Sequence, residues 1–369
     1  MKTLSGDRTF ALIVAILVIG GAAVFLSAAL GLLARQNADL GHLALTQLTL
    51  GLIPGLGALA FFRFLNPKIL ERGVVPFYIF ALIATSLVFI PSIGIHTNGA
   101  TRWIDVGPFT VQPAEFLKIA VVLMFAAYLA KMKSKLSDFR YGLGGFAVIV
   151  GIPALLLLLQ PNTSTALVIA AATVSMYFIA GAPLRDFVIL GVIILVGLCT
   201  LVAVRPYLLQ RVQTFLHPSQ DSLSSGYQIQ QSLIAIGSGG LLGRGFGQSV
   251  QKFNYLPEPV GDSIFAVYSE EFGFLGSVLL VLLFAAFAAR GFMIGAEASS
   301  AFGSFAVTGL TLIITVSAFL NIGAMLSIFP LTGLPLPFIS HGGTALLAAL
   351  ASVGVILNIA AHRSKQRAH

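Results

Sequence analysis

The chain has 369 residues, of which 57% are hydrophobic and 9% are charged, and its mean hydropathy is +0.96. A soluble domain carries about 25% charged residues, so this composition excludes a soluble protein and indicates a polytopic membrane protein. A single cysteine, Cys199, excludes an intramolecular disulfide. The net charge of +8 does not indicate a nucleic-acid partner, because the basic residues cluster at the ends of apolar segments and report topology instead.

Apolar segments long enough to cross a bilayer, which requires about 20 residues per helix, follow one another along the chain. The first runs from Phe10 to about Ala34 and is too long for a signal-peptide core, so we interpret it as a retained transmembrane helix. The sequence predicts an all-α polytopic membrane protein with about ten transmembrane helices. The predicted helices are 10–34, 43–65, 74–93, 114–131, 142–159, 165–181, 187–204, 263–289, 303–328 and 343–361.

The distribution of basic residues predicts the orientation. Lys2 and Arg8 precede the first helix, and about two thirds of the Lys and Arg residues fall in segments on the side of the N-terminus. Both termini are therefore predicted to be cytoplasmic. The polar loops 94–113, 205–262 and 329–342 then lie outside, the largest between the seventh and eighth helices. Irregular backbone near membrane depth is tolerated beside a water-filled cavity, so we expect an outward-facing cavity in one transmembrane domain spanning the chain.

Asp262 stands where the loop 205–262 re-enters the membrane. Because a bilayer penalises a carboxylate by several kcal/mol, one kept at this boundary is a candidate for the chemistry. Alternatively, Asp262 caps the eighth helix by accepting backbone N–H bonds, and a cap can also be catalytic. Glu258, between two prolines that stiffen the loop, is either a second acid or a solvated charge.

Two further charged pairs fall inside predicted helices. Glu115 and Lys118, at i and i+3 near the outer start of the fourth helix, lie on one helical face. They form either a structural ion pair or a pair that positions substrate and tunes a base. Glu270 and Glu271 fall about two turns into the eighth helix, where at least one is expected to face the interior and be paired.

Basic residues are few in the predicted outer loops, and each is a candidate for binding a diphosphate, because a guanidinium binds phosphate oxygens in pairs. The alternative for each is contact with a lipid headgroup. These residues are Arg102, Arg205, Arg211, Arg244 and Lys252.

The glycine-rich run 237–247 lacks the strand–helix context of a nucleotide-binding loop, so we interpret it as a flexible or closely packed hairpin. The histidines of the outer loops, His96, His217 and His341, are scattered along the chain. We therefore predict no metal site built from them.

Several runs of residues occur in the order that they have in a known family. They are Asn98-Gly-Ala-Thr-Arg-Trp-Ile104 with Gln112-Pro-Ala-Glu115; Gln160-Pro-Asn-Thr-Ser-Thr165; Arg211-Val-Gln-Thr-Phe-Leu-His-Pro218; Gly226-Tyr-Gln-Ile-Gln-Gln-Ser232; Ala235-Ile-Gly-Ser-Gly-Gly240; Tyr255-Leu-Pro-Glu258 with Asp262; and Gly333-Leu-Pro-Leu-Pro-Phe-Ile-Ser-His-Gly-Gly343. On these motifs, which cover most of the chain, the protein resembles the SEDS family (shape, elongation, division and sporulation), which includes FtsW and RodA. The run Gly247-Gln-Ser-Val-Gln-Lys252 resembles the FtsW branch more than RodA.

The chain departs from the family pattern at three places. The family's usual run before its essential acid is Ala-His-Thr-Asp, and here it is Pro259-Val-Gly-Asp262. Asn254 stands at a position that is often acidic, and Asn162 replaces the aspartate of the commoner Gln-Pro-Asp. The resemblance therefore implies a divergent member.

The resemblance implies a peptidoglycan glycosyltransferase that polymerises lipid II, the undecaprenyl-diphosphate-linked disaccharide-peptide, on the outer face of the bacterial cytoplasmic membrane. Asp262 matches the essential acid, and the reaction implied is a single inverting displacement in cell division or cell shape. No tightly bound cofactor is implied, although a divalent cation such as Mg²⁺ or Mn²⁺ is a further source of positive charge. The partners implied are membrane lipids and a class B penicillin-binding protein, a transpeptidase. The residues expected to bind substrate are Arg102, Glu115, Lys118, Arg211, Gln231, Glu258, Ser340 and Thr344.

Two other functions fit the resemblance: a flippase that moves lipid II across the membrane, and a non-catalytic scaffold for a transpeptidase. The polar loops are predicted on the outer side alone, whereas a transporter more often has midplane charges or broken helices reached from both faces. This asymmetry favours the enzyme.

Overall fold

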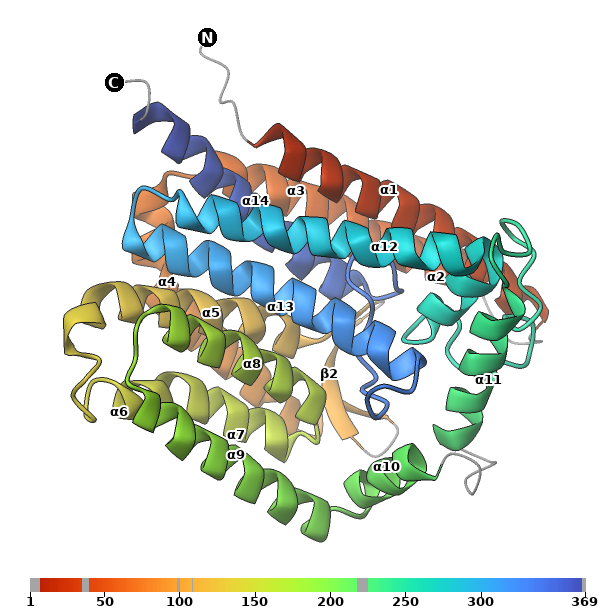
Figure 1. Cartoon of the computed structure of the whole chain (residues 1–369), viewed down its shortest axis with the longest axis horizontal. Helices are drawn as coiled ribbons and strands as arrows, with labels where there is room; N and C mark the ends of the chain where they lie inside the picture. The colour runs from red at the N-terminus through yellow and green to blue at the C-terminus, as the bar shows by residue number, and fades with distance from the viewer. Residues whose placement is uncertain (1–6, 35–39, 98–99, 108, 218–224, 367–369) are drawn as a thin grey trace.

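The computed structural model describes residues 7–34, 40–97, 100–107, 109–217 and 225–366. Most of these residues form long helices that lie side by side in one bundle (Figure 1). Eight helical segments are long and apolar enough to cross a membrane, and two shorter apolar helices, Leu143–Leu159 and Thr163–Ile179, fall at the predicted helices 142–159 and 165–181. The polytopic helical fold predicted from the sequence is therefore confirmed.

The main helices are α1 (Arg8–Leu30), α3 (Ile53–Phe64), α4 (Pro67–Ser86), α5 (Pro113–Met132), α7 (Ile152–Leu159), α8 (Thr163–Ile179), α9 (Leu184–Val204), α12 (Ile264–Ala296), α13 (Ala301–Met325) and α14 (Gly343–Gln366). Wider π turns join two short helices to their successors. These are α2 (Leu40–Thr46) through η2 (Gln47–Leu52) into α3, and α6 (Leu143–Phe146) through η5 (Ala147–Gly151) into α7. Short 3-10 turns follow three helices: η1 (Gly31–Ala34), η3 (Leu87–Phe89) and η4 (Lys133–Lys135).

The core of the bundle lies along α5, α13 and α14, which bury most of their length, whereas α9 is almost entirely exposed at the periphery. Small residues allow the buried helices to approach closely, as helix association in lipid requires. Gly309 of α13 packs against Met176 and Val122, and Gly354 of α14 packs against the backbone of Leu59. The first turns of α5 and α14 also line the site described below.

Helix α4, which corresponds to the predicted helix 74–93, begins at Pro67 rather than at residue 74. Asn66 caps it by accepting a hydrogen bond from the amide of Lys68 at 3.0 Å, and Pro67 occupies the first turn, where its missing N–H costs nothing. The prediction was wrong because it followed hydropathy, and the first turns of α4 carry the charged residues Lys68, Glu71 and Arg72.

The segment 94–113, predicted as an irregular loop in an all-α protein, contains a three-stranded antiparallel sheet. The strands are β1 (Gly94–Thr97), β2 (Ala100–Val106) and β3 (Phe109–Val111), in the order β1-β2-β3. The all-α assignment is thus corrected, because a short run of alternating residues gives a weaker sequence signal than a membrane helix. The sheet leads directly into α5, and Arg102 of β2 lines the same cavity as Glu115 in the first turn of α5.

The predicted loop 205–262 also contains two helices, α10 (Pro206–Leu216) and α11 (Ser225–Ser238). Pro206 starts α10 in the favoured first-turn position and forces the chain to break after α9. Both helices are too polar to be predicted as membrane spans. They lie at the end of the bundle opposite the first turn of α1 and the last turn of α14 (Figure 1).

Gly273 interrupts α12 with a non-helical backbone (φ 65°, ψ −163°). The glycine-rich run 237–247 satisfies the backbone groups at this break: two of its amides donate to carbonyls before Gly273, and two of its carbonyls accept from amides after it, all at 2.8–3.1 Å. A side chain at Gly243 or Gly273 would overlap the opposing backbone, so both positions require glycine. The closely packed alternative for this run is confirmed.

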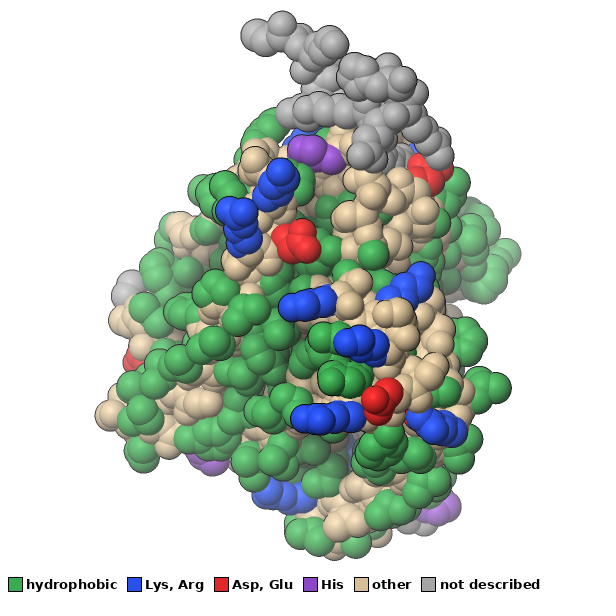
Figure 2. Space-filling view, turned by 90° about the vertical axis from the view of Figure 1, so that its left-hand side faces the viewer, with side chains coloured by type: hydrophobic (Ala, Val, Ile, Leu, Met, Phe, Trp, Pro, Cys, Tyr) green, Lys and Arg blue, Asp and Glu red, His purple; other side chains and the backbone are tan. Residues whose placement is uncertain are grey.

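Basic side chains gather at one end of the bundle (Figure 2). Figure 2 shows the face at the end where α1 starts and α14 finishes, and Lys and Arg side chains gather there among hydrophobic ones. We call it the terminal end, and the opposite one, with α10 and α11, the cavity end. Basic residues mark the cytoplasmic side of membrane proteins, so this arrangement agrees with the predicted orientation, which remains a prediction.

Candidate active site

A polar cavity of about 370 Å³ lies at the cavity end. Strand β2, the starts of α5 and α8, the segment 258–262 and the segment 332–345 line it. It brings together four residues predicted to be functional: Arg102, Glu115, Glu258 and Asp262. A concave site with convergent polar groups is the default candidate for binding and chemistry.

The backbone around Asp262 is held by hydrogen bonds from two other elements. Asn321 of α13 donates from Nδ2 to the carbonyl of Asp262 at 2.8 Å. Ser340 donates from Oγ to the carbonyl of Gly261 at 2.7 Å, and the amide of His341 donates to the carbonyl of Val260, also at 2.7 Å. The catalytic candidate is therefore fixed on the cavity wall by packed elements rather than by its own loop alone.

The carboxylate of Asp262 does not cap α12. The N-cap residue is Ser263, and no side chain makes a capping hydrogen bond there. Instead, Gln228 of α11 donates from Nε2 to Oδ1 of Asp262 at 3.1 Å and to Oγ of Ser263 at 2.9 Å. The capping interpretation of Asp262 is thus wrong, and its carboxylate lines the cavity while it accepts a hydrogen bond from Gln228.

Burial and, to a smaller extent, the negative charge of Glu258 together raise the pKa of Asp262 to about 6. The hydrogen bond from Gln228 and the more distant charge of Arg211 oppose this shift. A carboxyl with a pKa near 6 is ionised at neutral pH and takes up a proton more readily than an ordinary aspartate. This is the range in which a general base works best.

Glu258 is exposed and shares the cavity wall with Asp262. Its backbone is left-handed (φ 47°), a conformation that costs a non-glycine residue about 1 kcal/mol or more and is common at functional sites. The flanking prolines and two hydrogen bonds to its carbonyl, from Gly261 and Ser263, hold it there. Glu258 is thus an ordered group of the site.

Arg102 of β2 supplies the positive side of the cavity. Its Nη2 donates to the carbonyl of Pro161, which orients the guanidinium, and its buried Nε has no hydrogen-bond partner among the described residues. Burial and the nearby charge of Arg211 lower the pKa of Arg102. Arg211 itself lies over the ring of Tyr207 and does not line the cavity.

Asn162, at the start of α8, was not predicted as a site residue. It is buried, it lines the cavity, and its Nδ2 has no hydrogen-bond partner in the part of the chain that the structure describes. A buried donor left open toward a polar cavity is suited to bind an oxygen of a ligand. Its place in the run Gln160-Pro-Asn was the available signal.

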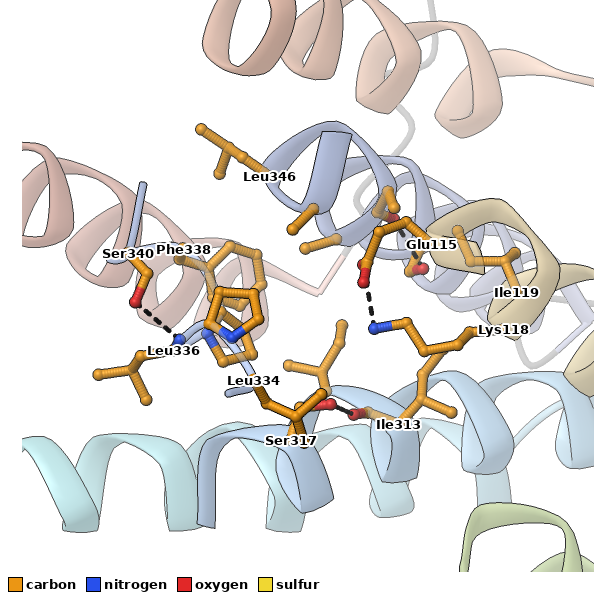
Figure 3. A pocket seen from close by; sticks show the side chains of 17 residues that line it. Glu115, Lys118, Ile119, Ile313, Ser317, Leu334, Leu336, Phe338, Ser340 and Leu346 are labelled. Carbon is orange, nitrogen blue, oxygen red and sulfur yellow. Dashed lines mark hydrogen bonds and ion pairs between the residues drawn. The ribbon is translucent and has the colours of Figure 1, made fainter. Parts of the chain in front are cut away.

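Glu115 and Lys118 form the ion pair expected from their spacing, with Nζ 3.0 Å from Oε2 and both side chains buried. Figure 3 shows Lys118 directed at Glu115 in a small cavity of about 40 Å³ next to the main one. Glu115 lines both cavities, and Lys118 lines only the small one. The ion pair therefore links the wall of the main cavity to that of the small one.

Ser340, Thr344 and Gln231, which were predicted to bind substrate, do not line the main cavity. Ser340 lines the small cavity, and its Oγ accepts from the amide of Leu336 (Figure 3). The same Oγ donates to the carbonyl of Gly261. Thr344 accepts a weak hydrogen bond from the amide of Gln112 at 3.4 Å. Gln231 lies one turn beyond Gln228, which is the amide that actually reaches Asp262.

Two of the basic residues considered for diphosphate binding are used elsewhere. Lys252 is completely buried and paired with Glu271, with Nζ 2.8 Å from Oε1, and Arg244 is paired with Glu270 at 3.4 Å. Both glutamates are buried, so the expectation that at least one is internal and paired is confirmed. Because Lys252 is buried and paired, its headgroup and diphosphate interpretations are both wrong. The sequence did not predict this pairing, because the partner lies on a different element.

An apolar groove of about 320 Å³ lies between α3, α4, α5 and α14. Phe116 and Ile119 of α5, one residue beyond Glu115 and Lys118 respectively, line its wall. The groove suits a hydrocarbon chain because its lining is almost wholly apolar. Within the described ranges, no group of three or more His, Cys, Asp and Glu side chains is arranged to hold a metal ion.

The sequence and the fold match known proteins over nearly the whole chain. The profile of the cell cycle proteins FtsW, RodA and SpoVE matches residues 7–365. Stage V sporulation protein E of Bacillus subtilis is 40% identical over 313 residues, which is 84% of this chain and 85% of that protein. The probable peptidoglycan glycosyltransferase FtsW of Trichlorobacter lovleyi is 36% identical over 355 residues, 96% of this chain and 93% of that protein.

Two solved structures share the fold. A chain from a peptidoglycan synthase complex, described for its coordination of polymerization and crosslinking, has a TM-score of 0.79 and 26% identity over 97% of this chain and 98% of its own length. The crystal structure of the rod shape determining protein RodA of Thermus thermophilus has a TM-score of 0.68 and 26% identity, covering 98% of this chain and 99% of that one.

Proposed function

This chain belongs to the FtsW, RodA and SpoVE family of cell cycle proteins, and from that membership we infer that it is a peptidoglycan glycosyltransferase of the bacterial cytoplasmic membrane, with Asp262 as its catalytic base. The observation that carries the role of Asp262 is its carboxylate on the cavity wall, engaged by Gln228 and not by the helix terminus. A carboxylate held in this way is free to take a proton from a bound hydroxyl.

The two sides of the cavity suit the two ends of the reaction with lipid II. Glu258 and Asp262 form an acidic side, and Arg102 with the open amide of Asn162 forms a donor side. A sugar hydroxyl requires an acceptor, and a diphosphate requires donors and positive charge. We propose that the acceptor hydroxyl binds near Asp262 and the donor diphosphate near Arg102.

In the proposed step, Asp262 removes the proton from a hydroxyl of one lipid-linked sugar as its oxygen bonds to the anomeric carbon of the other. The bond from that carbon to the diphosphate oxygen breaks, and the diphosphate leaves with the electron pair. Arg102, with Arg211 behind it, stabilises the charge that develops on the leaving group. The product sugar has the inverted configuration, because one displacement has taken place.

Glu115 and Lys118 are proposed to support this geometry from below. Their ion pair lies where the main cavity meets the small one. The apolar groove beside them is suited to one undecaprenyl chain of lipid II. Lipid chains are thereby directed into the membrane while the diphosphate reaches the polar cavity. Gln231, Ser340 and Thr344 remain proposals as substrate contacts.

A divalent cation such as Mg²⁺ or Mn²⁺ fits the acidic side, because Mg²⁺ is commonly held by one or two carboxylates together with substrate phosphates. Glu258 and Asp262 share that side and their charges act on each other, so these are the residues that would hold it. When bound, the ion would supply positive charge to the departing diphosphate.

We further propose that the protein acts in a complex with a class B penicillin-binding protein. The support is the match to a chain of a peptidoglycan synthase complex that coordinates polymerization and crosslinking. Co-purification from membranes tests this proposal. Recovery of a fully active chain that binds no transpeptidase under any condition would contradict it.

The test of the function is purified protein reconstituted with lipid II, with and without the class B partner. A glycan polymer on a gel is the expected product. A flippase would move lipid II across liposomes without forming polymer, and a scaffold would do neither. Equal polymer yields from the partner mixed with the parental chain and from the partner mixed with the Asp262→Asn chain would contradict the assignment.

A further inference from the structure

A buried charge cluster lies next to the active-site segment and takes no part in the proposed reaction. It consists of Ser27, Arg244, Ser249, Lys252, Glu270 and Glu271. The side chains of Lys252, Glu270 and Glu271 have at most 1% of their residue surface exposed. Such a cluster is costly to desolvate, so each of its charges must be matched.

Lys252 is matched by three groups from three elements. Its Nζ lies 2.8 Å from Oε1 of Glu271 on α12, 3.1 Å from Oγ of Ser27 on α1 and 2.9 Å from the carbonyl of Gly247. Ser27 in turn donates to the carboxylate of Glu271 at 2.7 Å. The ammonium group therefore ties the loop that carries it to α1 and α12 together.

Glu270 holds the same loop through its backbone. Its carboxylate accepts from Oγ of Ser249 at 2.6 Å and from the amides of Val250 and Gln251 at 3.1 and 3.2 Å. Arg244 adds a partly exposed ion pair. Together with the backbone bonds across the break at Gly273, these contacts fasten residues 240–252 to α12 on both sides of that break.

This fastening fixes both ends of the segment that carries the active-site acids. The chain leaves the cluster at Lys252, passes through Glu258 and Asp262, and enters α12 at Ile264. The part of α12 between Ile264 and the break at Gly273 also carries the two glutamates of the cluster. The position of Asp262 thus depends on where Lys252 is held relative to α12. Holding a reacting group in place is worth a large rate factor, and about 1 Å of misplacement can cost about 100-fold.

We propose that the Lys252–Glu271 ion pair is a positioning element that holds the segment 253–263, and with it Asp262, in the geometry required for catalysis. The proposal rests on the proposed function of Asp262. It assigns Lys252 and Glu271 no contact with substrate. Their contribution is transmitted through the backbone between residues 252 and 264.

The test is the double variant Lys252→Met/Glu271→Gln, assayed for lipid II polymerisation and thermal unfolding. A buried ion pair replaced by neutral residues of similar volume commonly leaves stability unchanged or raised, so the variant is expected to fold. The kcat is expected to fall by about 10- to 100-fold while KM for lipid II changes little, because binding groups are untouched. Parental kcat with an unchanged Tm would overturn the proposal.

The matched control is the ion pair at the other end of the same helix. Arg290 donates to both carboxylate oxygens of Asp7, at 3.1 and 2.6 Å, and the Asn of Asp7→Asn can still cap α1. Asp7→Asn/Arg290→Met neutralises a pair that joins α12 to the start of α1 and is far from Asp262 in the chain. Its kcat should stay within about twofold of the parent, and an equal loss in both double variants would contradict the positioning role.

Two measurements keep the test decisive if the first variant folds poorly. Ser249→Ala removes the hydroxyl that donates to Glu270 and accepts from the amide of Lys252, while both charges of the ion pair stay in place, so it should lower kcat several-fold with only a modest loss of Tm. Amide hydrogen exchange should rise in residues 253–263 of the cluster variants and not in the Asp7/Arg290 control. Activity of Asp262→Asn is measured in parallel: if that variant is active the proposed function fails, whereas inactive Asp262→Asn with fully active cluster variants defeats only the positioning proposal.

Discussion

The two ends of α12 use charged residues differently. At the terminal end, Arg290 and Asp7 satisfy each other with two hydrogen bonds, and Asp7 also caps α1. At the cavity end, Glu258 and Asp262 have no ion-pair partner among the residues that the structure describes, and they line a polar cavity. The comparison separates charges that hold helices together from charges that remain available for chemistry.

The cavity end contains both kinds of charge within one short stretch. Lys252 and Glu271 are completely paired and buried, and Asp262 lies between them in sequence with a raised pKa of about 6. An acid that is paired is normally stabilised as its anion, whereas burial without a cation favours the protonated form. Within this stretch the paired charges hold the structure, and Asp262, which has no cation beside it in the described part of the chain, is the acid that can exchange a proton.

The largest effect short of the base itself is expected at Arg102. Arg102→Gln keeps a hydrogen-bond donor and removes the charge that faces the leaving diphosphate, so polymerisation should fall by about 100-fold. Arg185→Gln is the matched control, because that guanidinium is partly exposed and paired with Asp186 at the terminal end. Equal losses in the two variants, measured as kcat/KM with lipid II, would mean that the cavity gives Arg102 no special role.

A smaller effect is expected at the floor of the cavity. Lys118→Met alone leaves Glu115 buried and uncompensated, which costs stability by about 3–5 kcal/mol, so the informative variant is Glu115→Gln/Lys118→Met. That variant should fold and should lower polymerisation by about tenfold, equivalent to about 1.4 kcal/mol of transition-state free energy. Unchanged activity with a changed Tm would show that the pair serves packing only.

The pH dependence sharpens the comparison further. A base must be unprotonated, so kcat/KM should fall as pH drops through the pKa of Asp262, about 6. Glu258→Gln removes a negative charge that raises this pKa, so the acidic limb should move to lower pH. A limb that stays in place in this variant would separate Glu258 from Asp262.

The smallest effect on activity is expected at the terminal end. Asp186, buried at the start of α9, accepts a hydrogen bond from Tyr177 at 2.6 Å and pairs with Arg185. Asp186→Asn should lower the free energy of unfolding by about 1–3 kcal/mol and leave kcat within about twofold of the parent. A large loss of kcat with a preserved Tm would break the distinction between the two ends.

The sequence predicted the features that depend on local patterns. Hydropathy located the helices, the i, i+3 spacing predicted the Glu115–Lys118 pair, and the loop-to-helix boundary singled out Asp262. It could not predict contacts between distant segments. The pairing of Lys252 with Ser27 joins residues that are 225 apart, and the amide that reaches Asp262 belongs to Gln228 rather than Gln231, a difference set by the rotation of α11.

The boundaries and the small sheet were also beyond the sequence. The charged first turns of α4 are helical because Asn66 and Pro67 cap it, although their hydropathy is that of a loop. The strands β1 to β3 are too short to give a reliable alternating pattern. Both errors arise because the environment of a residue, rather than its composition, decides its structure there.

The central claim is that Asp262 is the base of glycan polymerisation. The most direct test is lipid II polymerisation by purified Asp262→Asn. The substitution keeps the size and the hydrogen bond with Gln228 and removes the ability to take a proton at neutral pH. Burial raises the pKa of Asp262, so its ionisation lowers the stability of the folded protein as pH rises from about 4 through 6. The neutral Asn does not have this cost, so the variant should not lose Tm at pH 7. Polymerisation is predicted to fall by about 100-fold or more. Near-parental polymer yield from the folded variant would contradict the account.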